Sequence, residues 1–247
     1  MNLLEELARK HKADKYQHKY TDYYSNWFEP VRKDELKILE IGVFEGASAR
    51  MWAEYFPNSK IYCTDIAIGI DKRSVGCSEF IMNNLKSDRI FPHYIDQSNR
   101  EDMQKFIDIY SGNFDIIIDD GHHFQKHQQI SLGFLFPHLK EGGVYIIEDI
   151  TIPKDRYKGM SYNDCWGISD VDNFTDTTFN VLVDFVANNK LNSPYMTDEE
   201  IKYIEDEVEK DFHNICVRIV VKGTSCIASI NKKGQHLLNH MLAIENN

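Results

Sequence analysis

The sequence lacks any uninterrupted apolar stretch approaching the roughly 18 to 20 residues that a membrane-spanning helix needs. We therefore expect no membrane span. The amino-terminal run MNLLEELARKHK mixes acids and bases and has no apolar core of the kind found in signal peptides. The expected location is therefore the cytoplasm.

Paired cysteines and excess positive charge are also missing. The five cysteines are odd in number and widely spaced, with no CxxC pair, so the sequence gives no sign of a zinc or redox site. The net charge of −11 argues against a nucleic-acid partner, because phosphate contacts require a basic surface. No repeat, low-complexity block or linker divides the chain, and we expect residues 1–247 to form one domain.

The most informative stretch that is present is FDIIIDDG, residues 114–121, which two histidines follow. An apolar run that ends abruptly in Asp119 and Asp120 is typical of a buried parallel strand with carboxylates at its carboxyl end. Ligands bind at that edge of an open α/β sheet. Residues 122–138 then have helical spacing, so we expect Asp119, Asp120 and His123 to meet at a strand-to-helix turn.

A glycine-bearing turn follows the first predicted strand, residues 36–42. Gly42 and Gly46 permit a tight turn close to a ligand, and the next helix presents unpaired N–H groups there. The second strand ends in Asp65, where an acid is placed to accept ribose hydroxyls. Together with Glu40, these residues predict an adenosine-type ligand; the alternative is a plain βαβ unit whose acids cap helices.

The third predicted strand, residues 89–98, ends in Asp96, Gln97 and Ser98. These side chains are placed to hydrogen-bond an adenine edge. Asp96 or Ser98 could instead cap the following helix, residues 99–110, and the two roles are compatible.

The fifth predicted strand, residues 142–150, ends in Glu148 and Asp149. Together with Asp119 and Asp120 these acids form a cluster whose like charges repel unless a cation or protons lie among them. We therefore expect a divalent ion, and all-oxygen ligands favour Mg²⁺, with Mn²⁺ or Ca²⁺ as alternatives. The predicted ligands are Asp120, Glu148 and Asp149, whereas Asp119 orients the loop or faces the cofactor.

His123 is the predicted general base, with Asp120 as its catalytic partner on the metal. It lies three positions after Asp120, near enough to take a proton from a metal-held hydroxyl. Such a base contributes on the order of 10²- to 10⁴-fold to the rate. His122 and His127 are rival candidates, and a histidine at a helix start often serves packing alone.

Two flanking segments are expected near the cleft. Residues 1–35 form a lead-in whose aromatic side chains pack onto the core, and residues 150–171 read as a lid or acceptor loop, or as a surface insertion. The lead-in residues with a predicted role in covering the cleft are Asp14, Lys15, His18 and Tyr20.

Five segments resemble the sugar O-methyltransferases of the macrocin and mycinamicin type: ADKYQHKYTDYY, ILEIGVFEGASARMWAEYFPNSKIYCTDI, DQS, FDIIIDDGHHFQKHQ and GGVYIIEDI. The similarity covers residues 14–149, and its most specific part is the pairing of DDGxH with ED. It implies a Rossmann-like class I methyltransferase fold, α/β, with a seven-stranded, mainly parallel sheet and helices on both faces.

The resemblance also implies a site. Asp120, Glu148 and Asp149 would bind Mg²⁺, and His123 would act as the base. His122 departs from relatives, which usually carry Ser there. The S-adenosylmethionine contacts map onto Glu40, Gly42, Asp65 and the turn Asp96, Gln97 and Ser98.

The implied reaction is methyl transfer from S-adenosylmethionine to a sugar hydroxyl. The acceptor would be a surface-glycan or capsule precursor or a glycosylated natural product, and frequent Asn, Lys, Ile and Tyr favour a glycan of a low-GC bacterium. Alternatives are a non-sugar capsule decoration such as a phosphoramidate, a nucleotide- or NAD-binding protein, and a non-catalytic relative. The sequence does not name the acceptor, and it leaves open whether the chain forms a homo-oligomer.

Overall fold

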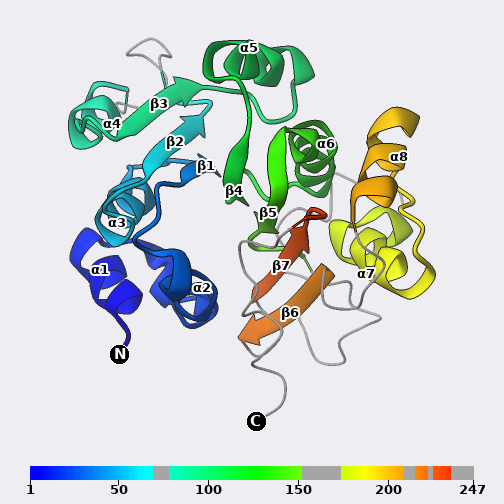
Figure 1. Ribbon diagram of the computed structural model, residues 1–247, viewed down its shortest axis with the longest axis horizontal. Helices are drawn as coiled ribbons and strands as arrows, with labels where there is room; N and C mark the ends of the chain where they lie inside the picture. The colour runs from blue at the N-terminus through cyan, green and yellow to red at the C-terminus, as the bar shows by residue number, and fades with distance from the viewer. Residues whose placement is uncertain (69–77, 152–173, 209–214, 222–224, 235–247) are drawn as a thin grey trace.

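A seven-stranded sheet in the order β3-β2-β1-β4-β5-β7-β6 forms the centre of the computed structural model, which describes residues 1–68, 78–151, 174–208, 215–221 and 225–234 (Figure 1). Strands β1 to β5 are parallel, and β7 is antiparallel to both β5 and β6. The expected mainly parallel sheet is confirmed. The strands are β1 (Lys37–Ile41), β2 (Lys60–Asp65), β3 (Ile90–Tyr94), β4 (Phe114–Asp119), β5 (Leu139–Ile147), β6 (Ile215–Val221) and β7 (Ser225–Asn231).

Helices cover both faces of the sheet, as expected (Figure 1). The α-helices on one face are α1 (Leu3–His11), α2 (Tyr20–Phe28), α3 (Ala47–Tyr55) and α4 (Ser78–Asn84); on the other they are α5 (Arg100–Tyr110), α6 (Gln125–Leu135), α7 (Thr178–Asn188) and α8 (Asp198–Glu207). Short 3₁₀ helices are η1 (Asp14–Tyr16), η2 (Glu29–Val31), η3 (Phe136–His138) and η7 (Phe174–Asp176).

The isoleucines of β4 show why an apolar run forms this central strand. Successive side chains of a strand point to opposite faces. Ile116 and Ile118 pack in the core under α1 to α4, while Ile117 packs in the core under α5 to α8. All three are fully buried. Both faces therefore need apolar residues, and the polar side chains of β4 lie near its two ends: Asp115 at the start, where it accepts hydrogen bonds from Lys37 N and Lys140 Nζ, and Asp119 at the carboxyl end.

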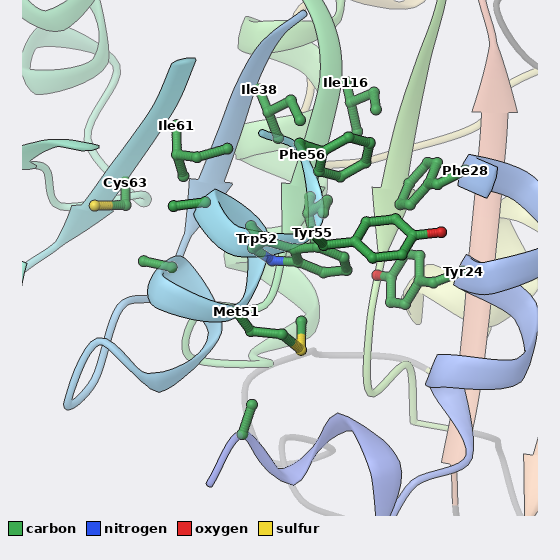
Figure 2. Packing of buried hydrophobic residues seen from close by; sticks show 14 of the residues in the cluster. Tyr24, Phe28, Ile38, Met51, Trp52, Tyr55, Phe56, Ile61, Cys63 and Ile116 are labelled. Carbon is green, nitrogen blue, oxygen red and sulfur yellow. The ribbon is translucent and has the colours of Figure 1, made fainter. Parts of the chain in front are cut away.

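Aromatic side chains fix α2 against α3 (Figure 2). The ring of Tyr24 lies 5.2 Å from those of Phe28 and Trp52, and Phe28 lies 5.5 Å from Phe56. All four are fully buried. The expectation that lead-in aromatics pack onto the core is confirmed for Tyr24 and Phe28. This packing places α2 beside the carboxyl ends of β4 and β5.

The start of α5 corrects one prediction. Asn99 is the N-cap, and its Oδ1 accepts a hydrogen bond from the backbone nitrogen of Glu101 at 2.9 Å. The expected caps Asp96 and Ser98 instead bond each other, because Asp96 Oδ1 accepts from both the nitrogen and the hydroxyl of Ser98. The turn before α5 is therefore closed by a local acid–serine pair.

One predicted segment falls outside the described residues. The loop expected at 150–171 lies there from residue 152 onward. Among the helices that the structure describes, none has the length and apolarity needed to cross a membrane.

Candidate active site

A cleft of about 580 Å³ opens at the carboxyl ends of β1, β2, β3 and β4. This volume is in the range of small-molecule sites. Ten residues with a predicted or rival role line it: Asp14, Gly42, Asp65, Asp96, Gln97, Ser98, Asp120, His122, His123 and His127. The cleft therefore joins the predicted cofactor end to the predicted catalytic end.

Gly42 makes the first wall of the cleft and has no room for a side chain. Its φ is +91°, and a Cβ there would lie 2.0 Å from the carbonyl oxygen of Asp120. Its N–H donates to the carbonyl of Thr64 at 2.8 Å. Gly42 thus allows the β1 turn and the β4 turn to touch, which brings the two ends of the site together.

Asp65 holds the glycine turn and lines the cleft. Its Oδ2 accepts hydrogen bonds from the backbone nitrogens of Val43 and Phe44, both at 2.9 Å, and its Oδ1 accepts from Ala67 at 2.8 Å. The carboxylate is therefore fixed by three backbone donors. It lies where the sequence predicted an acid facing a ribose.

Two predicted cofactor residues, Glu40 and Gly46, lie behind the cleft wall. Glu40 is fully buried and accepts hydrogen bonds from Trp52 Nε1 and Ser48 Oγ, both at 2.9 Å. Burial raises the pKa of Glu40 to about 7, although the Lys15 ammonium opposes that rise. Gly46 faces the side chain of Leu85. Both residues therefore support the glycine turn without lining the cleft.

Asp119 also lies behind the wall, at 1% exposure. Its carboxylate accepts hydrogen bonds from Ser131, from Gln97 Nε2 at 3.1 Å and from the Tyr145 hydroxyl at 3.3 Å. Burial raises the pKa of Asp119 to about 6. Of the two roles that the sequence left open, this geometry favours orienting the loop.

Gln97 connects the β3 end with the turn after β4. Its Nε2 donates to Asp119, and its Oε1 accepts the N–H of His122 at 2.8 Å. A Cβ on Gly121 would lie 1.8 Å from that Oε1. The amide is 7% exposed, so its contribution to the site is chiefly to hold the histidine-bearing turn.

Asp120, His123 and Asp149 form a candidate metal group at the ends of β4 and β5. One ligand atom from each lies within 4.8 Å of the other two. His123 Nδ1 is buried without a hydrogen-bond partner, and His123 Nε2 lies 3.8 Å from Asp149 Oδ2. Two carboxylates and an imidazole are a donor set that divalent ions accept. The residues present therefore fit a divalent ion.

Backbone strain accompanies this group. His123 has φ +60° and Asp149 has φ +49°, in the left-handed region that non-glycine residues rarely adopt. Such conformations cluster at functional sites, where surrounding contacts impose them. One of these contacts is the Tyr20 hydroxyl, which donates to Asp149 Oδ1 at 2.6 Å and accepts the Asp149 N–H at 3.2 Å.

The predicted third ligand, Glu148, lies outside the candidate metal group. It is 2% exposed, and its Oε1 accepts hydrogen bonds from Lys15 Nζ at 2.7 Å and from the Tyr24 hydroxyl at 2.5 Å. Burial and the nearby Asp120 charge raise its pKa. In this structure Glu148 is directed toward the lead-in, and His123 is the residue that lies within the same distance of Asp120 and Asp149.

Lys15 and Tyr24 are the site residues whose part the sequence did not foresee. Lys15 was expected to cover the cleft, but its ammonium binds Asp120 and Glu148; Tyr24 packs as expected and also donates a hydrogen bond to Glu148. Burial would lower the pKa of Lys15, but Asp120, Glu148 and Glu40 outweigh it and raise that pKa. In the sequence Lys15 directly follows Asp14 in a stretch rich in lysine, histidine and tyrosine, and nothing local indicates the distant acids that it binds.

The fold defined here, with its strand order and its cleft at the carboxyl edge, is that of the class I methyltransferases. MycE methyltransferase from the mycinamycin biosynthetic pathway, solved with Mg and SAH, superposes with a TM-score of 0.66 at 27% identity, over 93% of this chain and 54% of that one. A second MycE structure, with Mg, SAH and mycinamycin VI, gives a TM-score of 0.64 at 25% identity.

Residues 39–150 match the Methyltransf_24 family, described as a methyltransferase domain. Mycinamicin VI 2''-O-methyltransferase of Micromonospora griseorubida is 34% identical over 60% of this chain and 36% of its own length. Demethylmacrocin O-methyltransferase of Streptomyces fradiae is 34% identical over 54% of this chain and 32% of its own length. The resemblance to sugar O-methyltransferases is confirmed, and the chain spans about a third of these relatives.

Proposed function

We propose that this chain is an S-adenosylmethionine-dependent and divalent-metal-dependent O-methyltransferase that acts on a sugar hydroxyl. The observation that carries the proposal is the continuous cleft, which runs from the turn of Gly42 and Asp65 to Asp120 and His123. A methyl donor and an acceptor must occupy adjoining parts of one site. The named activities of the relatives support the same reading.

The cofactor end would hold S-adenosylmethionine, which supplies an electrophilic methyl group. Asp65 is fixed by backbone donors at the position for ribose hydroxyls. The Asp96 and Ser98 turn lines the neighbouring wall, where an adenine edge would lie. Gly42 keeps the wall close to Asp120 and so sets the distance between the two halves of the site.

The catalytic end would hold a divalent ion through Asp120 and Asp149, with Glu148 as the remaining candidate ligand and His123 beside the ion as the base. When bound, such an ion lowers the pKa of a coordinated hydroxyl. His123 Nδ1 is buried, so Nε2 is the nitrogen that an acceptor hydroxyl reaches and that takes its proton. Asp149, 3.8 Å from Nε2, stabilises the resulting imidazolium.

The proposed acceptor is a sugar hydroxyl on a surface-glycan or capsule precursor, or on a glycosylated natural product. The names of two relatives, which print an olivosyl and a rhamnosyl group, support the sugar, and the MycE complex with mycinamycin VI supports a small-molecule acceptor. The glycan precursor rests on composition alone.

The test is a screen of nucleotide sugars, glycan precursors and glycosylated small molecules for uptake of labelled methyl, with and without EDTA. We expect transfer that EDTA abolishes and Mg²⁺ or Mn²⁺ restores. Transfer that survives thorough chelation would remove the metal from the proposal. Equilibrium dialysis against S-adenosylmethionine and NAD checks the cofactor, and preference for NAD would overturn the methyltransferase assignment.

A further inference from the structure

The buried acids already have a cation among them, the ammonium of Lys15. Its Nζ lies 2.5 Å from Asp120 Oδ2, 2.7 Å from Glu148 Oε1 and 3.5 Å from Glu40 Oε1. The lysine side chain is 1% exposed, and the glutamates are 0% and 2% exposed. Water screens these charges poorly, so their mutual interactions are strong.

Lys15 reaches the acids because the lead-in is packed against the sheet. Ala13, two positions earlier, is buried and donates its N–H to the carbonyl of Ala8 at 2.9 Å, which ties η1 to the end of α1. On the other side, Tyr24 of α2 donates to the same Glu148 oxygen that Lys15 binds. The position of the ammonium is therefore set by η1, which carries Lys15, and by α2, whose Tyr24 binds the same glutamate oxygen. It is a buried charge and not a surface charge.

We propose that Lys15 is a positioning residue that acts as a built-in counter-ion: it holds Asp120 and Glu148 in place and weakens the binding of a divalent ion beside them. The inference rests on the proposed function, because it concerns the metal group in the same cleft. Asp120 is the shared element, since it belongs to that group and also contacts Lys15.

An ammonium in contact with a ligand carboxylate neutralises part of its charge and repels a second cation that approaches the same group. Removal of the ammonium leaves Glu40, Asp120 and Glu148 with no internal counter-charge among the described residues. A divalent ion then meets a more negative site. A lysine that merely supported the fold would have the opposite signature, because its loss would loosen the ligands and weaken metal binding.

The experiment measures Mn²⁺ affinity of the full chain by calorimetry and by the spin-resonance signal of free Mn²⁺. Lys15→Met keeps the length of the side chain and removes its charge. We expect Mn²⁺ to bind on the order of tenfold more tightly, or better, than to the unaltered chain. Without metal the variant should melt at a lower temperature, and Mn²⁺ should raise that temperature by more than it does in the unaltered chain.

Lys12→Met is the matched control, because Lys12 is exposed and lies three positions away in the same lead-in. It removes the same charge without a contact to the acids, and solvent screens its effect. The Mn²⁺ affinity of Lys12→Met should therefore stay near that of the unaltered chain.

Unchanged or weaker Mn²⁺ binding in Lys15→Met would overturn the counter-ion role and leave the proposed function standing. If that variant folds only when Mn²⁺ is added, the role is supported, because another cation replaces the ammonium. Failure to fold even with Mn²⁺ overturns it. Methyl transfer that resists EDTA would refute the metal dependence of the enzyme, whereas Mn²⁺ binding gained by Lys15→Met would still support this inference. Absence of Mn²⁺ binding in every variant would overturn both.

Discussion

The hydroxyl of Tyr20 bonds both the carboxylate and the backbone of Asp149, at 2.6 Å from Oδ1 and 3.2 Å from the amide nitrogen. One phenol thereby fixes the side chain and the left-handed backbone of a residue at the end of β5. Because Tyr20 belongs to α2, the amino-terminal lead-in takes part in building the proposed catalytic end of the site.

The first prediction concerns this contact. Tyr20→Phe keeps the ring and removes the hydroxyl, which frees Asp149 and costs about 1 kcal/mol of unfolding free energy. We expect Mn²⁺ affinity and kcat to fall together, each by roughly tenfold, the factor that about 1.4 kcal/mol of lost positioning produces. Calorimetry and single-turnover methyl transfer measure the two effects. Tyr23→Phe on the same helix is the control, and equal losses in both variants would show that Tyr20 acts through packing alone.

The second prediction concerns Gly42. Gly42→Ala places a Cβ 2.0 Å from the Asp120 carbonyl oxygen, at a φ of +91°. Strain of this kind costs on the order of 1 to 3 kcal/mol, and relief requires the β1 and β4 turns to separate. We expect a lower melting temperature and weaker S-adenosylmethionine binding by dialysis.

Gly46→Ala is the comparison for that experiment, because its φ is also positive, at +78°. Its Cβ would meet the flexible end of the Leu85 side chain at 2.7 Å, which can move. We expect the smaller stability loss there. A larger loss in Gly46→Ala than in Gly42→Ala would show that contact between the two turns is unimportant.

The third prediction concerns pH and Glu40. Its folded-state pKa of about 7 lies above the ordinary 4.5, so the folded protein holds a proton that the unfolded chain has lost between those values. Stability from this group is therefore present at low pH and declines as pH rises from 4.5 through 7, by up to about 3 kcal/mol.

Urea unfolding of the unaltered chain and of Glu40→Gln at pH 5 to 8 checks whether stability falls as the pH rises. Glutamine cannot ionise, so the free energy of unfolding of Glu40→Gln should decline less between pH 5 and pH 8 than that of the unaltered chain. Trp52 Nε1 keeps an oxygen acceptor in the variant, which limits other losses. Parallel curves would mean that Glu40 titrates alike in the folded and unfolded chains.

The fourth prediction separates the histidines. His123→Ala should lower kcat by on the order of 10²- to 10⁴-fold, as loss of a general base does, while S-adenosylmethionine binding stays intact. His122 packs its ring on Phe124, with centroids 3.9 Å apart, and should tolerate Ala with a far smaller loss of kcat. If His122→Ala is the more damaging variant, the base has been assigned to the wrong residue.

The positions of the acids at the sheet edge could be predicted because local chemistry fixes them. Ile116 to Ile118 must be buried on both faces, so the chain leaves the sheet where the apolar run stops, at Asp119 and Asp120. The same logic placed Asp65 at the end of β2. The role of each acid was harder to predict, because it depends on distant partners: Asp119 points into the protein and accepts hydrogen bonds from Gln97 and Ser131.

The sequence by itself determined the succession of the five parallel strands along the chain, the glycine turn at Gly42 and the strand ends from which acids emerge, because these follow from apolar periodicity and backbone freedom within short stretches. The tertiary structure alone decided that Lys15 would meet Glu148, 133 positions away along the chain. The burial and the charge environment of Glu148 depend on how α1 and α2 pack on the sheet. A local sequence pattern does not predict the position of an ammonium from a distant part of the chain.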